Sequence, residues 1–258
     1  MLLAFDVGNT TIAIGLFRGR KLVKSWKVKT DSGKTSDEYG ATLLDLMRVS
    51  GLAASKITGA IISSVVPPLT PVIEEVCRAY FATTASVVGP RLKTGMPILY
   101  ETPLEVGADR ITAAVAAFEK YGGPLIILDF GTATTFDAVS AKGEYLGGAI
   151  APGIQISAEA LYLKTAKLPR IEIRKPKRAI GRTTVASMQS GLYFGYIGLV
   201  TKTIEEIRKE LGAEARVVAT GGWGEQIASE LAEIDAYEPD LVLDGLRIIH
   251  DRNRDARD

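Results

Sequence analysis

The segment Leu3-Ala4-Phe5-Asp6-Val7-Gly8-Asn9-Thr10-Thr11 returns near the middle of the chain as Ile126-Ile127-Leu128-Asp129-Phe130-Gly131-Thr132-Ala133-Thr134. In both copies a short apolar run, typical of a buried strand, ends in an aspartate that is followed by a glycine and hydroxyl side chains. A repeat at matching places indicates duplication of one structural unit. The sequence therefore predicts two related domains, which we expect at residues 1–116 and 117–258.

Strands and helices are predicted to alternate around each copy. Up to residue 121, we expect strands at 2–5, 12–17, 21–28, 59–65 and 85–88 and helices at 36–50, 69–81 and 106–121. Ser36 is the expected cap of the first helix. Beyond residue 121, we expect strands at 125–128, 136–140, 145–150 and 216–220 and helices at 154–166, 184–211, 225–233 and 243–251. This alternation is typical of an α/β fold whose sheets are covered by helices.

The composition narrows the class of protein. The chain has 258 residues, of which 47% are hydrophobic, and a net charge of +1, so it carries no electrostatic footprint for nucleic acid or acidic lipid. A single cysteine, Cys77, excludes an intrachain disulfide and fits a reducing cytoplasm. The start of the chain lacks the basic region of a signal peptide, and no apolar run reaches the roughly 18 residues that span a bilayer. We expect a cytoplasmic protein without nucleic-acid or membrane partners.

The two aspartate–glycine loops indicate phosphate chemistry. Backbone N–H groups in such a turn form an anion-binding concavity, and glycine allows close approach of a ligand. The aspartates would repel phosphate directly, so their expected role is to hold a metal ion or its waters. One copy would be equally compatible with an ordinary hairpin turn, whereas two copies at matching places favour a functional site.

Three other patterns carry less information. The strand and glycines of Val218 to Glu225 suit packing of a nucleotide base or ribose, but such turns are common. Gly33-Lys34-Thr35 resembles the end of a P-loop, yet the position that requires the first glycine is Val28. His250 is the single histidine, so a structural zinc site is not expected and His250 itself is expected to be a packed or surface residue.

Asp109 is the preferred acid–base candidate once those patterns are set aside. It lies in Glu105-Val106-Gly107-Ala108-Asp109-Arg110, at the start of an alanine-rich helix. A carboxylate there can simply interact with the helix dipole. A loop precedes it, however, and Arg110 adds a cation suited to a ligand that carries a carboxylate.

These motifs together resemble the type III pantothenate kinases, bacterial enzymes that open coenzyme A synthesis. The Asp–Gly–Thr loops alone indicate only the actin-like ATPase superfamily, which includes acetate and sugar kinases and Hsp70. Three further motifs, which occur in the family's order along the chain, restrict the resemblance to this one family. They are Gly107-Ala108-Asp109-Arg110, Gly147-Gly148-Ala149-Ile150-Ala151-Pro152-Gly153 and Thr220-Gly221-Gly222. It implies duplicated ribonuclease H-like (actin-like ATPase) domains with mixed sheets flanked by helices.

The resemblance also implies roles for individual residues. It implies that Asp109 is the general base and that Asp129 helps to bind a monovalent cation, K⁺ or NH₄⁺. The residues implied to bind ATP, with a divalent ion expected to be Mg²⁺, are Asp6, Val7, Gly8, Asn9, Thr10, Thr11, Ile12, Ala13 and Thr132. Those implied to bind pantothenate are Tyr100, Gly107, Ala108, Asp109, Arg110 and Thr184. A homodimer is implied as well.

Several alternatives stay open at this point. The chain could be another small-molecule kinase of the same superfamily, acting on a sugar or a small acid. It could be a nucleotide-operated binding or filament protein, although such chains usually carry extra subdomains. It could also be a non-catalytic regulatory accessory factor with this fold, against which the three aspartates Asp6, Asp109 and Asp129 argue.

Overall fold

The computed structural model describes residues 1–212 and 214–254, which form two compact units. The first unit comprises Met1–Lys120 and the described residues from Asp240 onward, and the second comprises Tyr121–Pro239. These units differ from the division expected at 1–116 and 117–258, because the last helix, α7 (Leu241–Arg254), packs on strands of the first unit. The expected division stays a prediction about the duplicated halves.

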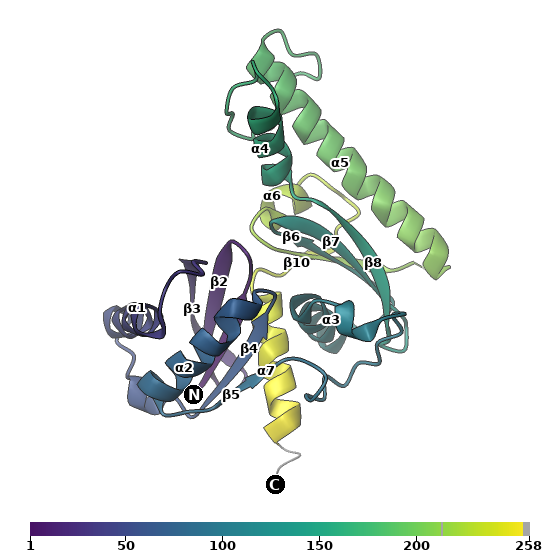
Figure 1. The fold of residues 1–258 in the computed structure, drawn as a ribbon. Coiled ribbons are helices and arrows are strands. Elements are labelled where there is room, and N and C mark those ends of the chain that lie inside the picture. Colours follow the sequence, from purple (N-terminus) through teal and green to yellow (C-terminus); the bar gives the residue numbers. More distant parts are fainter. Residues whose placement is uncertain (213, 255–258) are drawn as a thin grey trace. The chain divides into compact units, whose positions relative to one another are not determined.

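In the first unit, the described chain forms a five-stranded sheet in the order β3-β2-β1-β4-β5 (Figure 1). Strand β1 pairs antiparallel with β2 and parallel with β4. The strands are β1 (Leu2–Val7), β2 (Thr11–Arg18), β3 (Lys21–Lys29), β4 (Gly59–Ser64) and β5 (Ala85–Val87). The helices are α1 (Ser36–Val49), α2 (Thr70–Phe81), α3 (Ala108–Tyr121) and α7, with short 3₁₀ turns η1 (Ala54–Lys56), η2 (Pro67–Leu69) and η3 (Pro103–Glu105).

In the second unit, the described sheet has the order β10-β9-β6-β7-β8. Its strands are β6 (Leu125–Phe130), β7 (Ala133–Val139), β8 (Tyr145–Pro152), β9 (Arg216–Thr220) and β10 (Ala236–Tyr237). Strand β6 pairs antiparallel with β7 and parallel with β9, so it occupies the place that β1 has in the first sheet. The two sheets thus share one topology, and the predicted α/β fold with two related mixed sheets is confirmed.

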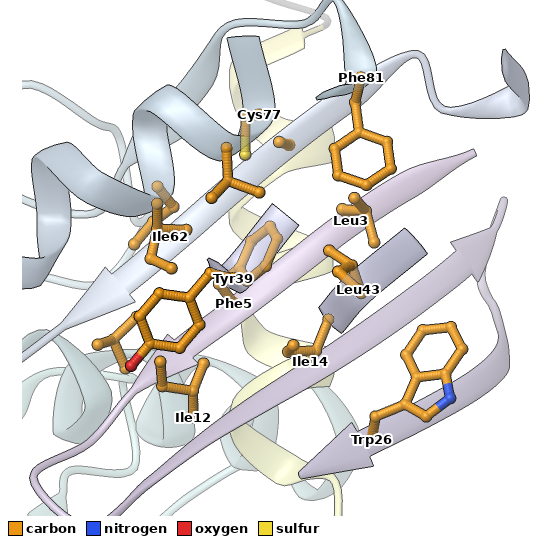
Figure 2. Packing of buried hydrophobic residues seen from close by; sticks show 14 of the residues in the cluster. Leu3, Phe5, Ile12, Ile14, Trp26, Tyr39, Leu43, Ile62, Cys77 and Phe81 are labelled. Atoms are coloured by element: carbon orange, nitrogen blue, oxygen red, sulfur yellow. The ribbon is translucent and has the colours of Figure 1, made fainter. Parts of the chain in front are cut away.

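Alternate residues of β1 point to opposite faces of the first sheet, and both faces are covered. Leu3 and Phe5 pack with side chains of β2, α1 and α2, and Figure 2 shows this cluster. Helix α7 covers the opposite face. A Cβ built on Gly15, which points to that face, would lie 3.2 Å from Leu243 Cδ1. Since both faces of the central strand are buried, β1 reads as a continuous apolar run that ends at Asp6.

The core of the second unit lies between its sheet and α5 (Thr184–Leu211). Ile126, Leu128 and Phe130 of β6 pack in one cluster with Tyr196 and Val200 of α5. Helix α4 (Ile154–Lys164) lies beside the N-terminal part of α5 (Figure 1), and α6 (Gly224–Ala228) follows β9. The second aspartate, Asp129, is therefore on the face of β6 away from this core.

The sequence-based cap of α1 was wrong by one residue. Thr35, not Ser36, is the N-cap, since its backbone is extended and its hydroxyl accepts from the backbone N–H of Glu38 at 3.3 Å. The Glu38 carboxylate in turn accepts from the Thr35 N–H at 2.8 Å, which completes a capping box. The helix expected at 225–233 ends at Ala228, and β10 was not expected because it has only two residues.

Cys77 and His250 are both packed residues, which for His250 is one of the two placements expected from the sequence. Cys77 is fully buried, and burial, with a smaller contribution from Glu74, raises the pKa of its thiol to about 12. His250 packs on the first sheet, where a Cβ built on Gly59 would lie 3.0 Å from its Nε2. The raised pKa makes the Cys77 thiol a poor nucleophile. Within residues 1–212 and 214–254, no helix is both long and apolar enough to cross a membrane.

Candidate active site

The first aspartate–glycine loop is an anchored turn with an exposed tip. Asp6 lies partly buried at the carboxyl end of β1, and the N–H of Gly8 donates to the Thr11 carbonyl at 3.1 Å. Thr30 holds the loop from the side, since its hydroxyl donates to the Gly8 carbonyl at 2.6 Å and its N–H to the Thr10 carbonyl at 3.0 Å. The fixed turn has Asn9, Thr10 and Thr11 exposed at its tip.

In the second loop, the backbones of Gly153 and Gly221 come close to neighbouring residues. Gly153 donates its N–H to the Thr132 carbonyl at 3.1 Å, and a Cβ on Gly153 would lie 2.4 Å from that oxygen. Gly221 has a φ of +90°, and a Cβ there would lie 2.4 Å from Asp129 Oδ1. Only glycine gives both this backbone conformation and this approach, so the Asp129 carboxylate lies in a cradle that any side chain at 221 would fill.

Asp109 lies in the first turn of α3, where its Oδ1 accepts from the backbone N–H of Arg110 at 2.8 Å. Burial raises the pKa of this carboxyl, and the Arg110 N–H and guanidinium only partly oppose that effect. A partly buried carboxylate with a raised pKa at a helix start is a stronger proton acceptor than a solvated one.

Val65 joins the start of α3 to the first loop. Its N–H donates to the Val7 carbonyl at 3.1 Å, one residue after Asp6. Its Cγ1 lies 3.6 Å from the position that a Cβ on Gly107 would take. The end of β1, the residue that follows β4 and the segment that leads into Asp109 are therefore neighbours in one unit. Sequence reasoning did not single out this link, because it depends on how β1 and β4 pair.

The remaining predicted residues are divided between the two units. Tyr100, half-buried in the segment between β5 and α3, belongs to the first unit with Gly107 to Arg110. Thr132 and Thr184 belong to the second, where both are exposed and Thr184 opens α5 behind the N-cap Thr183. The roles of these residues stay predictions.

The donor set suits the divalent ion that the resemblance implies. Among the described residues, no group of three or more His, Cys, Asp or Glu side chains gathers around one point. Mg²⁺ usually keeps several waters and binds through one or two carboxylates and the substrate phosphates, and Asp6 beside the first loop suits that mode. A buried hydroxyl without a hydrogen-bond partner, Ser63 Oγ, lies on the neighbouring strand.

A family model described as type III pantothenate kinase matches residues 2–206. The chain belongs to this family. The type III pantothenate kinase of Geobacter sulfurreducens is 54% identical over 255 residues, which cover 99% of this chain and 100% of that protein.

Solved structures share the fold at low sequence identity. A Campylobacter jejuni protein described as a Baf family transcriptional activator is 18% identical with a TM-score of 0.63, over 98% of this chain and 99% of that one. An inorganic polyphosphate/ATP-glucomannokinase from Arthrobacter is 13% identical with a TM-score of 0.50, over 97% and 98% of the two chains. These likenesses support the expected sugar-kinase and actin-like fold.

Proposed function

We propose that the protein transfers the γ-phosphoryl group of ATP to the primary hydroxyl of pantothenate, giving 4'-phosphopantothenate in the first step of coenzyme A biosynthesis. The observation that carries the proposal is the Asp109 carboxylate, partly buried and of raised pKa. The segment that leads into it lies beside Val65 at Gly107, and Val65 bonds to Val7 at the end of β1, next to the first phosphate loop. Membership of the type III pantothenate kinase family supports the choice of substrate.

Phosphoryl transfer depends on positioning and charge neutralisation more than on covalent chemistry. The exposed tip of the segment from Asp6 to Ala13, at Asn9, Thr10 and Thr11, contacts the ATP phosphates, and Thr132 contacts the nucleotide. Asp6 holds the divalent ion, which neutralises phosphate charge when it is bound. Because the Gly8 turn is already fixed by Thr30 and Thr11, little ordering is needed when the phosphates bind.

Asp109 accepts the proton that the pantothenate hydroxyl loses as the new P–O bond forms. A carboxylate within about 2.6–3.2 Å of that hydroxyl is sufficient for this transfer. Tyr100, Gly107, Ala108 and Thr184 hold the rest of the substrate. The Arg110 guanidinium is suited to the substrate carboxylate, which it can bind through two parallel hydrogen bonds.

The substrate is tested by coupling ADP release to a colour change, with pantothenate and a panel of sugars and small acids offered in turn. We expect turnover with pantothenate and with no sugar. Phosphorylation of a sugar without any response to pantothenate would contradict the proposal in favour of another kinase of the same fold. Absence of turnover with every acceptor would favour a regulatory factor.

A monovalent cation at Asp129 leads to a separate prediction. Asp129→Asn is expected to weaken the K⁺ stimulation of turnover at least about 10-fold, because it removes the charged ligand from the Gly221 cradle. The measurement is a K⁺ titration of the initial rate at constant ionic strength, with Na⁺ as the substitute. Glu225→Gln removes an exposed carboxylate from α6 and should leave the K⁺ response unchanged. An unaltered K⁺ response in Asp129→Asn would exclude Asp129 as the ligand.

We also propose a homodimer and a cytoplasmic location. Large apolar side chains are exposed on α4 and α5, among them Tyr162, Leu163 and Phe194, and apolar patches of this kind are typical of interfaces. Light scattering after size-exclusion chromatography measures the mass, and a monomer at micromolar concentration would contradict the dimer. The single buried thiol of Cys77 suits a reducing compartment.

A further inference from the structure

Ser63 carries a buried hydroxyl that forms no hydrogen bond within the described part of the chain. Its side chain is fully buried, with 0% of its surface exposed, and its Oγ lacks a partner. Buried polar atoms are nearly always hydrogen-bonded, and an exception usually marks an unseen water, an ion or a functional role. An alanine at this position would avoid the cost of the unsatisfied hydroxyl.

The position of this hydroxyl is next to Asp6. Strands β1 and β4 are parallel neighbours, and Ser63 is the direct partner of Asp6 in their register. Partners in a register point to the same face of a sheet. Ile62 points to the α1 and α2 side with Phe5, so Ser63 and Asp6 both point to the opposite face. The hydroxyl and the carboxylate are thus adjacent at the carboxyl ends of two parallel strands.

The second half of the molecule repeats this arrangement. Strand β9 holds the place of β4, and the register partner of Asp129 is Thr220, again a buried hydroxyl residue. Two strand pairs of one duplicated fold therefore each place a hydroxyl beside their aspartate. A hydroxyl stands beside the aspartate in both sheets, and the one in the first sheet has no hydrogen-bond partner. This points to a ligand next to the aspartate rather than to packing.

Resting on the kinase function proposed above, we propose that Ser63 is a positioning residue for the hydrated divalent cation that accompanies ATP. Its hydroxyl donates to, or accepts from, a water of the cation's hydration shell, beside the Asp6 carboxylate. Water is the expected intermediary because Mg²⁺ gives up its waters reluctantly and Ser63 lies behind the exposed edge. Val65, two residues further on, contacts both Val7 and the Gly107 position, so the same strand end orders the approach to Asp109.

The test measures Mn²⁺ affinity by electron paramagnetic resonance in the presence of a non-hydrolysable ATP analogue and without pantothenate. Ser63→Ala is expected to weaken Mn²⁺ binding about 10-fold, as loss of an outer-shell partner of a metal usually does. The same variant should raise the thermal midpoint of the ligand-free protein by about 2 °C or more, since an unsatisfied hydroxyl is removed. Excess Mg²⁺ should restore its turnover.

Two further variants make the result specific. Ser63→Thr keeps the hydroxyl and should keep Mn²⁺ affinity within about threefold of the parent, a difference smaller than one typical hydrogen bond. Ser64→Ala is the matched control, because the Ser64 hydroxyl already bonds to the backbone N–H and carbonyl of Val66 at 3.2 Å. It should leave Mn²⁺ affinity unchanged.

A Ser63→Ala protein that binds Mn²⁺ as tightly as the parent would overturn the proposed role of Ser63. If that variant were also more stable than the parent, the hydroxyl would matter only for packing. Failure of the proposed function has a different signature. Mn²⁺ and nucleotide binding would then still depend on Ser63, while pantothenate would not be phosphorylated by the parent protein.

Discussion

Asp109→Asn is expected to lower kcat by about 10²- to 10⁴-fold, the range over which general bases contribute, while ATP affinity stays within about twofold. Asparagine has the shape of aspartate but cannot accept the hydroxyl proton of the acceptor. The Arg110 N–H can still donate to the side-chain oxygen at position 109, so the start of α3 keeps its geometry. Steady-state kinetics and calorimetric titration with ATP provide the two measurements.

The pH dependence of the parent enzyme gives the same base a second test. Burial raises the pKa of Asp109 above its ordinary value of 3.8. Because the base must be ionised, kcat/KM is expected to fall as the pH falls through this raised pKa. The acid limb of the profile should therefore lie at a higher pH than a solvated aspartate would give, and it should disappear from the residual activity of Asp109→Asn.

The raised pKa also predicts a gain in stability for Asp109→Asn. The folded chain binds this proton more tightly than the unfolded chain. The carboxyl group's contribution to stability is thus fully present below the unfolded pKa and is lost as the pH rises through the folded pKa. Above the folded pKa, the buried charge opposes folding, so in that pH range asparagine should raise the thermal midpoint of the ligand-free protein.

Glu105→Gln is the matched control for the charge, because Glu105 is an exposed carboxylate in the turn η3 just before α3. It should leave both kcat and the acid limb unchanged. Near-normal turnover in Asp109→Asn would remove Asp109 as the base and direct attention to another proton acceptor.

Gly221→Ala is expected to destabilise the protein by about 2–5 kcal/mol, through a strained left-handed backbone and overlap with its neighbours. The new Cβ would lie 2.4 Å from Asp129 Oδ1 and 2.6 Å from the backbone nitrogen of Phe130. Since the strand end must shift to relieve this overlap, the K⁺ response should weaken together with stability. A urea titration and a K⁺ titration of the rate measure the two effects.

Gly222→Ala is the control that distinguishes the effect of the close contact at Gly221 from the effect of losing a flexible glycine. No atom lies within 4 Å of a Cβ at position 222, so alanine there should change stability by no more than about 1 kcal/mol. Equal and small effects of the two substitutions would show that the close approach at Gly221 does not position Asp129.

Most of the fold follows from local patterns. The apolar runs before Asp6 and Asp129 predicted both central strands, and the long helix expected at 184–211 has those bounds in the structure. The misses come from short or competing signals. Thr35 and Ser36 are adjacent hydroxyl residues, and Thr35 is the cap because Glu38 stands three residues after it. A strand of two residues, β10, has no period to detect.

The site was only partly predictable from the sequence, because its parts meet through sheet register. The motifs indicated Asp6, Asp109 and Asp129. No local pattern indicated that Ser63 lies beside Asp6, since this contact depends on the parallel pairing of β1 with β4. The hydroxyl that follows an apolar run in both β4 and β9 was the available signal, and it gains meaning only when the two sheets are compared.

The return of α7 to the first unit has a consequence for synthesis on the ribosome. One face of β1 and β2, at Gly15 for example, is covered by Leu243 of the last helix. Ribosomes add about 5–20 residues per second, so on the order of tens of seconds pass between synthesis of the N-terminal sheet and synthesis of the helix that covers it. The second unit, continuous from Tyr121 to Pro239, has all its residues earlier. The half that is translated first is therefore the half that is completed last, and a nascent chain arrested before residue 241 leaves an apolar sheet face open to chaperones.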